Sequence, residues 1–219
     1  MRQLFLFTSL GFIIGLVSFN ETELDTKNST QNFKSKGYTE EEIYYFKEIT
    51  LKNELNSKIR LSPVKFKSDI KIYVYGDYEP YMLDEVKRVI SDLNNIIDPI
   101  DLSIVKNRSE SNVVMYFGDY QTFISDNPDL RRISQLKNCD GFFITKSRGD
   151  EIKSSRVFIN LPNQDSVFDL RDCVREEITQ QSGLCNDFDL PGSCFSSEQN
   201  EILEYSDLDI KLIKMLYNE

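Results

Sequence analysis

Apolar residues in this chain recur first with the spacing of a β-strand and then with the spacing of a helix. From Ile70 to Val74 apolar and polar residues alternate, which predicts a half-buried strand. Directly afterwards the spacing becomes helical, with apolar residues at Leu83, Val86, Val89, Ile90 and Leu93. A strand that leads into an amphipathic helix predicts an α/β domain, because the helix has to bury its apolar face on the sheet.

Other periodic segments complete this pattern. Further strands are expected from Ile100, Asn112, Asp140 and Ser155. Helices are expected from a capping box at Thr39 and Glu42 to near Leu55, from about Ser166 to Ser182, and from about Ser206 to Tyr217. The order predicts one α/β (α+β) domain over residues 38–219. Its twisted mixed sheet of about five strands is expected to pack on two long helices, with a further helix at the C-terminus.

The composition excludes several classes of function. The 219 residues carry a net charge of −10, with a pI near 4.7, so we expect no nucleic-acid partner and no docking on anionic lipid headgroups. The chain has no histidine. This excludes Ser-His-Asp and Cys-His catalysis and every histidine-ligated zinc site, and it leaves carboxylates, amides and hydroxyls as functional groups.

The N-terminus predicts export from the cytoplasm. Arg2 precedes an uncharged apolar run from Leu4 to Phe19, which is shorter than a membrane span of about 20 residues. Residues 1–19 are interpreted as a signal peptide or an N-terminal membrane anchor, with a buried core helix as the third alternative. Residues 20–37 are polar and aperiodic, which predicts a flexible linker. The protein is expected to be periplasmic, secreted or anchored to the membrane.

Export bears on the four cysteines, because disulfides form in oxidising compartments. Cys185 and Cys194 are close enough in sequence to close one loop, which leaves Cys139 to pair with Cys173. These are the two expected disulfides, although sequence alone allows three connectivities. The alternative is that the four residues are buried thiols.

The helix expected over residues 166–182 has an apolar stripe and a polar flank. The stripe consists of Val167, Leu170, Val174 and Ile178. At 100° per residue, the flank beside this stripe carries Glu176, Glu177 and Gln180. Arg175 and Thr179 are expected to point to the far side. The flank therefore gathers three side chains that can donate or accept hydrogen bonds.

A turn is expected directly after this helix. Gly183 can end the helix in the left-handed conformation that is open to glycine. The turn can then bring Asn186 and Asp187 back towards the polar flank. The helix and turn together predict a cluster of carboxylates and amides.

This spacing resembles the long motif of the zincin metallopeptidases, His-Glu-x-x-His-x-x-Gly-x-x-His. Aligned on Gly183, Glu177 matches the catalytic glutamate. The three zinc-binding histidines are replaced, by Glu176, Gln180 and Asn186. The alternative register, with Arg175 and Thr179 at histidine positions, loses the glycine and is rejected.

The resemblance to zincins extends to neighbouring segments. The strand from Asp140 corresponds to the edge strand that lines the zincin substrate cleft. Phe195, in the loop over residues 192–197, stands where many of these proteases carry the methionine of the Met-turn. Residues 206–218 resemble the last helix of the metzincins. The resemblance implies a zincin-like domain that lacks the zinc site.

Five segments in the same order also resemble an uncharacterised bacterial exported family, known as domain of unknown function 2927. They are YYFKEITLKNEL, SDIKIYVYGD, SNVVMYFGD, REEITQQSGLCND and SDLDIKLIKMLYN, and they span residues 41–217. Members of the family typically carry proline where this chain has Cys185. The resemblance implies a relative in fold and names no reaction.

Three functions are compatible with these patterns. The first is a non-catalytic binding module of the cell envelope, whose partner is an envelope protein or an extended peptide on the edge strand. The second is a structural role, in which the polar helix face bonds to the loop between Cys185 and Cys194. The third is a hydrolase-like enzyme that uses Glu177 as general base.

The enzyme hypothesis includes a hard cation. Oxygen ligands suited to calcium, magnesium or manganese are offered by Glu176, Gln180, Asn186 and Asp187. No cofactor is expected for a binding module, and zinc is not expected in either case. The membrane is expected to be contacted only through the N-terminal segment, and the protein is expected to be a monomer.

Overall fold

The computed structural model describes residues 30–52, 59–188, 190, 192–196 and 203–219. The chain divides into two compact units, with the boundary after Tyr44, inside helix α2 (Glu40–Leu51). The predicted signal peptide or anchor at residues 1–19 and the predicted helix end at Leu55 lie outside the described residues. None of the helices in the described ranges has the length and apolar character needed to cross a membrane.

In the first unit, residues 30–35 are helical, although they fall within the segment predicted to be a linker. The predicted capping box is confirmed. The amide of Thr39 donates to Glu42 at 2.8 Å, and the amide of Glu42 donates to the hydroxyl of Thr39 at 3.1 Å. Helix α2 therefore begins where the sequence pattern placed it.

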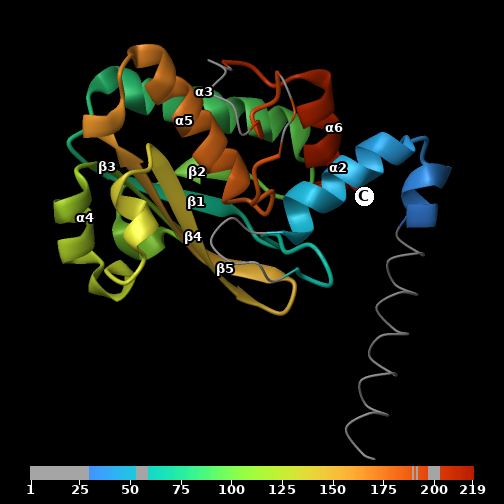
Figure 1. The fold of residues 1–219 in the computed structure, drawn as a ribbon, viewed down its shortest axis with the longest axis horizontal. Helices are drawn as coiled ribbons and strands as arrows, with labels where there is room; N and C mark the ends of the chain where they lie inside the picture. Colours follow the sequence, from blue (N-terminus) through green and yellow to red (C-terminus); the bar gives the residue numbers. More distant parts are fainter. Residues whose placement is uncertain (1–29, 53–58, 189, 191, 197–202) are drawn as a thin grey trace, which may run out of the picture. The chain divides into compact units, whose positions relative to one another are not determined.

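The second unit, Tyr45–Glu219, is built on a five-stranded sheet (Figure 1). Its strands are β1 (Ile70–Gly76), β2 (Leu102–Ile104), β3 (Val113–Gly118), β4 (Gly141–Arg148) and β5 (Glu151–Asn160). Their order is β2-β1-β3-β5-β4, and all neighbours are parallel except β4, which runs antiparallel to β5. The predicted mixed sheet is confirmed, with β4 as one of its edges.

Helices cover this sheet on both faces. They are α3 (Pro80–Ile96), α4 (Tyr120–Asp126), α5 (Val167–Gln180) and the C-terminal α6 (Asp207–Tyr217). α3 and α5 lie side by side over one face of the sheet (Figure 1). Ser166 and Ser206 cap α5 and α6 by accepting backbone hydrogen bonds of 3.1 Å, which confirms the predicted starts of both helices.

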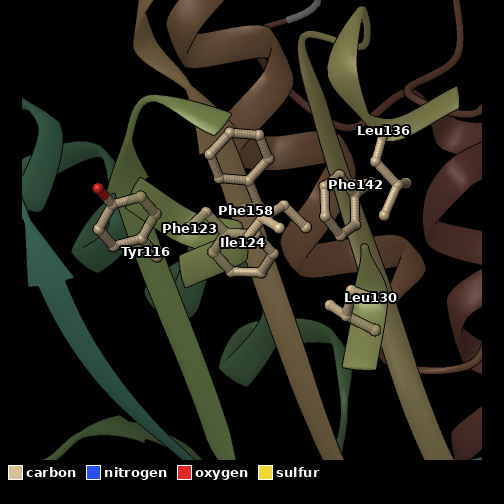
Figure 2. Packing of buried hydrophobic residues seen from close by; sticks show 7 residues of the cluster. All are labelled: Tyr116, Phe123, Ile124, Leu130, Leu136, Phe142 and Phe158. Carbon is tan, nitrogen blue, oxygen red and sulfur yellow. The ribbon is translucent and has the colours of Figure 1, made fainter. Parts of the chain in front are cut away.

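The opposite face of the sheet carries a cluster of buried aromatic and aliphatic side chains (Figure 2). Its members are Tyr116, Phe123, Ile124, Leu130, Leu136, Phe142 and Phe158. Tyr116, Phe158 and Phe142 form a row across β3, β5 and β4, because they are cross-strand partners on one face. Phe123 of α4 stacks on Phe158, with ring centroids 4.7 Å apart. No helix was predicted between β3 and β4, and the structure has α4 there.

Neither predicted disulfide is formed, and all four cysteines are present as thiols. Cys139 packs against the aromatic cluster, and its thiol lies 3.2 Å from the carbonyl of Leu136. Cys173 lies on α5, which covers the other face of the sheet, so the strand that begins at Gly141 separates the two side chains. The disulfide prediction for Cys139–Cys173 was therefore wrong for a topological reason.

The second predicted pair was wrong for a local reason. Cys185 lies beside Arg60, whose guanidinium donates to its sulfur at 2.9 Å. Cys194 belongs to a turn that is held on α6, because its amide donates to the buried carboxylate of Asp209. The two thiols are buried in separate surroundings, and closeness in sequence does not bring them together.

The end of α5 depends on Gly183. Its φ is +128°, a conformation that L-residues with a side chain rarely adopt. A Cβ on this residue would lie 2.1 Å from the carbonyl oxygen of Val64 and 3.2 Å from Leu216 of α6. Gly183 was predicted to end the helix. In the structure it also lets the backbone at Val64 and the side chain of Leu216 lie close to the end of α5.

We expect Gly183→Ala to lower the free energy of unfolding by about 4 kcal/mol, since backbone strain and overpacking each cost a few kcal/mol. Gly149→Ala is the matched control, because Gly149 also has a positive φ, +65°, but a Cβ on it would meet nothing within 4 Å. The control is expected to cost about 1–2 kcal/mol. Urea unfolding of both variants measures the difference, and equal losses would contradict the close-approach argument.

Candidate functional site

The site is built on α5, which is buried around most of its circumference. Leu170, Val174 and Ile178 face the core as predicted, whereas Val167 is half exposed. Arg175 and Thr179 were predicted to point to the far side of the helix, and both are completely buried there. The far side packs against α3 and Tyr205, so over the second half of the helix only Glu176 is partly exposed.

Three of the four residues predicted as a polar cluster meet at one amide. Gln180 is buried, and its side-chain nitrogen donates to the carboxylate of Glu176 at 3.1 Å. The same nitrogen donates to the carboxylate of Asp187 across the turn. Two carboxylates are therefore joined by one amide group, which offsets their mutual repulsion.

Asn186, the fourth predicted member, points elsewhere. Its side-chain nitrogen donates to the backbone carbonyl of Glu48 in α2 at 3.4 Å and to that of Asp187 at 2.7 Å. The turn after Gly183 thus brings back Asp187 but directs Asn186 to a neighbouring helix. Asn186 ties the turn to α2.

Glu177, the candidate general base, lies under the first residue of the edge strand. It is 6% exposed. A Cβ on Gly141 would lie 2.7 Å from the Glu177 Oε1 atom and 2.6 Å from the Cys173 sulfur, so only glycine lets the start of β4 approach α5 this closely. The sequence did not indicate this contact, because a glycine at the start of a predicted strand does not by itself show that a helix lies close to it.

The surroundings of Cys173 are apolar and negatively charged. Burial raises the pKa of this thiol well above its ordinary value, and the carboxylates of Glu177 and Glu176 raise it further. The pKa of Cys194 is raised in the same way, by burial first and by Asp209 next. Both thiols are therefore protonated at neutral pH, and neither is an activated nucleophile.

Phe195, predicted to replace the methionine of a Met-turn, is completely buried. Its carbonyl accepts a 2.8 Å hydrogen bond from Phe188, which follows directly on the polar turn. Its amide donates to the Ser193 hydroxyl at 3.1 Å, and this hydroxyl donates to Asp209 of α6. The turn around Phe195 is thus fixed between α6 and the segment that carries Asp187.

Arg175 and its partners were missed by the sequence analysis. The guanidinium donates to Asp92 of α3 at 2.8 Å and lies 4.4 Å from the ring centroid of Tyr205. Tyr205 in turn shares a 2.6 Å hydrogen bond with Thr179. Glu85 and Arg171, nearer the helix starts, form a second link between α3 and α5, at 2.8 Å. These links fix the position of α5, and the only sequence signal for them is the spacing of opposite charges on two helices.

The residues at the histidine positions do not fit a zinc ion. Gln180 and Asn186 use their amide nitrogens as donors inside the protein, and a metal ion needs lone pairs instead. Within the described part of the chain, no group of three His, Cys, Asp or Glu residues could hold a metal ion. A hard cation between Glu176 and Asp187 would require Gln180 to turn its amide so that the oxygen faces inwards.

The sheet order and the antiparallel edge strand over α5 define an α/β domain with a mixed sheet. The chain belongs to the family described as Protein of unknown function (DUF2927), whose model matches residues 40–219. This confirms the family resemblance carried by the five sequence segments. No curated protein matches the chain.

Solved structures that are similar to this chain include two of myroilysin. One, "Structure of Myroilysin", is 11% identical, with a TM-score of 0.44, over 69% of this chain and 80% of that one. The other, "Crystal structure of myroilysin", is 12% identical, with a TM-score of 0.36, over 56% of this chain. The similarity to "Crystal structure of myroilysin" covers 45% of the myroilysin chain.

We expect the free energy of unfolding to fall as the pH rises above about 8.5, the ordinary pKa of an unfolded cysteine. Because the folded pKa of Cys173 is raised, the folded state holds a proton that the unfolded state releases, and stability is lost as the pH approaches the folded pKa. Each such group contributes a slope of at most about 1.4 kcal/mol per pH unit.

Urea unfolding at about pH 7.5 and about pH 10 measures this slope for the wild type and for Cys173→Ala. The variant is expected to have the smaller slope, since it lacks one of the titrating groups. An identical slope would mean that Cys173 does not titrate on unfolding, as in a disulfide.

Proposed function

We propose that this protein is an exported, zincin-like module of the cell envelope that binds an extended polypeptide segment without cleaving it. The observation that carries the proposal is the open edge of β4: within the described ranges no strand pairs with its outer side, and the strand begins at Gly141, directly over α5. An open edge strand pairs with an added strand through main-chain hydrogen bonds. The absence of histidine and the raised thiol pKa values support a role without catalysis.

The pairing of β4 with β5 decides which main-chain groups face the open edge. Asn160 donates its amide hydrogen to the carbonyl of Asp140, so residues at even positions of β4 exchange hydrogen bonds with β5. The N–H and C=O groups of Gly141, Phe143 and Thr145 consequently point away from β5. Three alternate residues therefore offer donors and acceptors to an incoming strand.

Glu177 and its neighbours support binding at the same place. The carboxylate of Glu177 lies against Gly141, the first residue of the open edge. A peptide that pairs with β4 reaches α5 at this point, where Glu177 can accept a hydrogen bond from a main-chain or side-chain donor. The side-chain amide of Gln180 donates to Glu176 and to Asp187, so these hydrogen bonds hold the polar side chains of this flank in place.

The pairing can be tested with Thr145→Pro. Proline removes the N–H that points to the open edge, and the ladder with β5 does not use this group. Dodecapeptides selected from a random library on the wild-type chain are expected to bind Thr145→Pro about tenfold more weakly, as measured by fluorescence anisotropy. Thr145→Val, which keeps the N–H and the shape, is the matched control and is expected to bind like the wild type.

Two outcomes would contradict the binding module. Equal affinity of Thr145→Pro and Thr145→Val would show that the peptide does not pair with β4. Cleavage of the selected peptides, detected by mass spectrometry and lost in Glu177→Gln, would favour the enzyme. The substitution keeps the size of the side chain and removes its charge, so it separates general-base chemistry from packing.

The hydrolase-like enzyme with a hard cation is the second candidate, and the meeting of Glu176 and Asp187 at Gln180 is the observation that favours it. We expect the purified full chain to contain no calcium, magnesium or manganese near one ion per chain by elemental mass spectrometry, because the amide nitrogen lies between the two carboxylates. A metal near one per chain that disappears in Glu176→Ala and in Asp187→Ala, but not in Asp84→Ala, would overturn this expectation.

A further inference from the structure

The carboxyl ends of the parallel strands meet at one end of the sheet. β1 ends at Gly76, β3 at Gly118 and β5 at Asn160, and the strand register places these ends beside one another. α3 begins after β1 and α5 after β5, so both helices start at this end of the sheet, whereas α4, which follows β3, lies on the opposite face. Ligands of open α/β sheets commonly bind at such an end.

Exposed apolar side chains gather at this end. Among the described residues of the second unit, six large hydrophobic side chains are exposed. Four of them lie at the starts of α3 and α5: Tyr78 (37% exposed), Tyr81 (45%), Val167 (52%) and Phe168 (49%). An exposed apolar group of this kind on an acidic, charged domain indicates a contact surface.

The contact between α3 and α5 places the members of this group at the starts of two adjacent helices. Arg171 of α5 donates to Glu85 of α3 at 2.8 Å, so these two positions are adjacent. Tyr81 lies one turn before Glu85, and Val167 and Phe168 lie one turn before Arg171. Since one turn rises about 5.4 Å in both helices, the exposed residues lie at the same level on two adjacent helices. Tyr78 extends the group to β3, with its ring 6.2 Å from that of Phe117.

Negative charge surrounds the apolar group. Residues 76–86 and 157–170 contain no lysine or arginine. Six carboxylates lie in these segments. Asp84 and Glu85 are paired with Lys87, Arg88 and Arg171, which follow the segments directly. The other four, Asp77, Glu79, Asp165 and Asp169, form no ion pair within the described ranges. Asp119 follows the end of β3 and caps α4. The rim is therefore acidic, without a basic residue of the same segments to neutralise it.

We propose that this carboxyl-end surface, formed by Tyr78, Tyr81, Val167 and Phe168 inside an acidic rim, docks a basic polypeptide segment with aliphatic or aromatic anchors. The anchors cover the apolar centre, and lysine or arginine side chains pair with the rim carboxylates. The surface is separate from the open edge of β4 and from the polar cluster on α5. Its existence does not depend on peptide binding at that edge.

The test uses the full chain and a fluorescent dodecapeptide of alternating leucine and lysine, followed by anisotropy. Tyr81→Ser/Phe168→Ser removes the apolar centre, and Asp77→Asn/Asp165→Asn weakens the rim without changing that centre. Both double variants are expected to bind about tenfold more weakly than the wild type. Ile59→Ser/Leu61→Ser is the control, because it removes side chains that are 67% and 76% exposed at another place.

The control is expected to bind like the wild type, and a peptide of alternating leucine and glutamate is expected not to bind. Equal affinity of all variants, or equal binding of the glutamate peptide, would overturn the proposal. Self-association in sedimentation equilibrium that Tyr81→Ser/Phe168→Ser abolishes would overturn it in favour of a second copy of this chain. All substituted residues are on the surface, so unchanged unfolding midpoints verify that the fold is retained.

Discussion

The burial of α5 on nearly all sides is the constraint on which the rest of the structure depends. A polar group that is removed from water needs a hydrogen-bond partner, or it costs about 1–3 kcal/mol. Arg175 meets this need only in part: one nitrogen donates to Asp92 and the guanidinium lies over the ring of Tyr205, while its Nε and Nη1 atoms have no hydrogen-bond partner within the described ranges. Thr179 meets it with the Tyr205 hydroxyl. Gln180 meets it by joining two carboxylates. Each partner comes from a different segment, so the polar residues of this helix determine how α3, the turn after Gly183 and the residues before α6 are arranged.

The same requirement explains how a helix with zincin-like spacing can hold other side chains at the histidine positions. In a metal site, three side chains direct lone pairs at one point, and the ion neutralises their repulsion. In this chain an amide nitrogen of Gln180 supplies the positive end of a dipole at that point, and Asn186 turns away to the carbonyl of Glu48. The cluster is internally satisfied as it stands. The carboxylate of Glu177 lies close to Gly141, at the beginning of the edge strand β4.

The sequence predicted the elements whose apolar spacing is regular and long, and it missed those that depend on distant contacts. The alternation from Ile70 and the capping serines of α5 and α6 have a single physical interpretation, and they were correct. Helix α4 has only seven residues, which is too short for a helical stripe to be distinguished from a loop. Arg175 was placed correctly on the far side of the helix, but the apolar stripe alone does not show that this side is buried as well. The thiols of Cys139 and Cys173 were paired by elimination, but strand β4 lies between them.

Net charge and local charge lead to different conclusions about partners. The net charge of −10 opposes polyanions at a distance, but specificity depends on where the charges lie. Arg108 lies over the ring of Tyr75, 5.5 Å from its centroid, on the sheet face away from α3 and α5. The carboxyl-end surface, by contrast, carries four carboxylates that form no ion pair in the described part of the chain, and the neighbouring Lys87, Arg88 and Arg171 are paired with Asp84 and Glu85. A basic partner is therefore oriented towards this end before contact, within a Debye length of about 8 Å at physiological salt. Since Asn160 at this end is bonded to Asp140, which precedes β4, the same orientation also presents the beginning of the open edge.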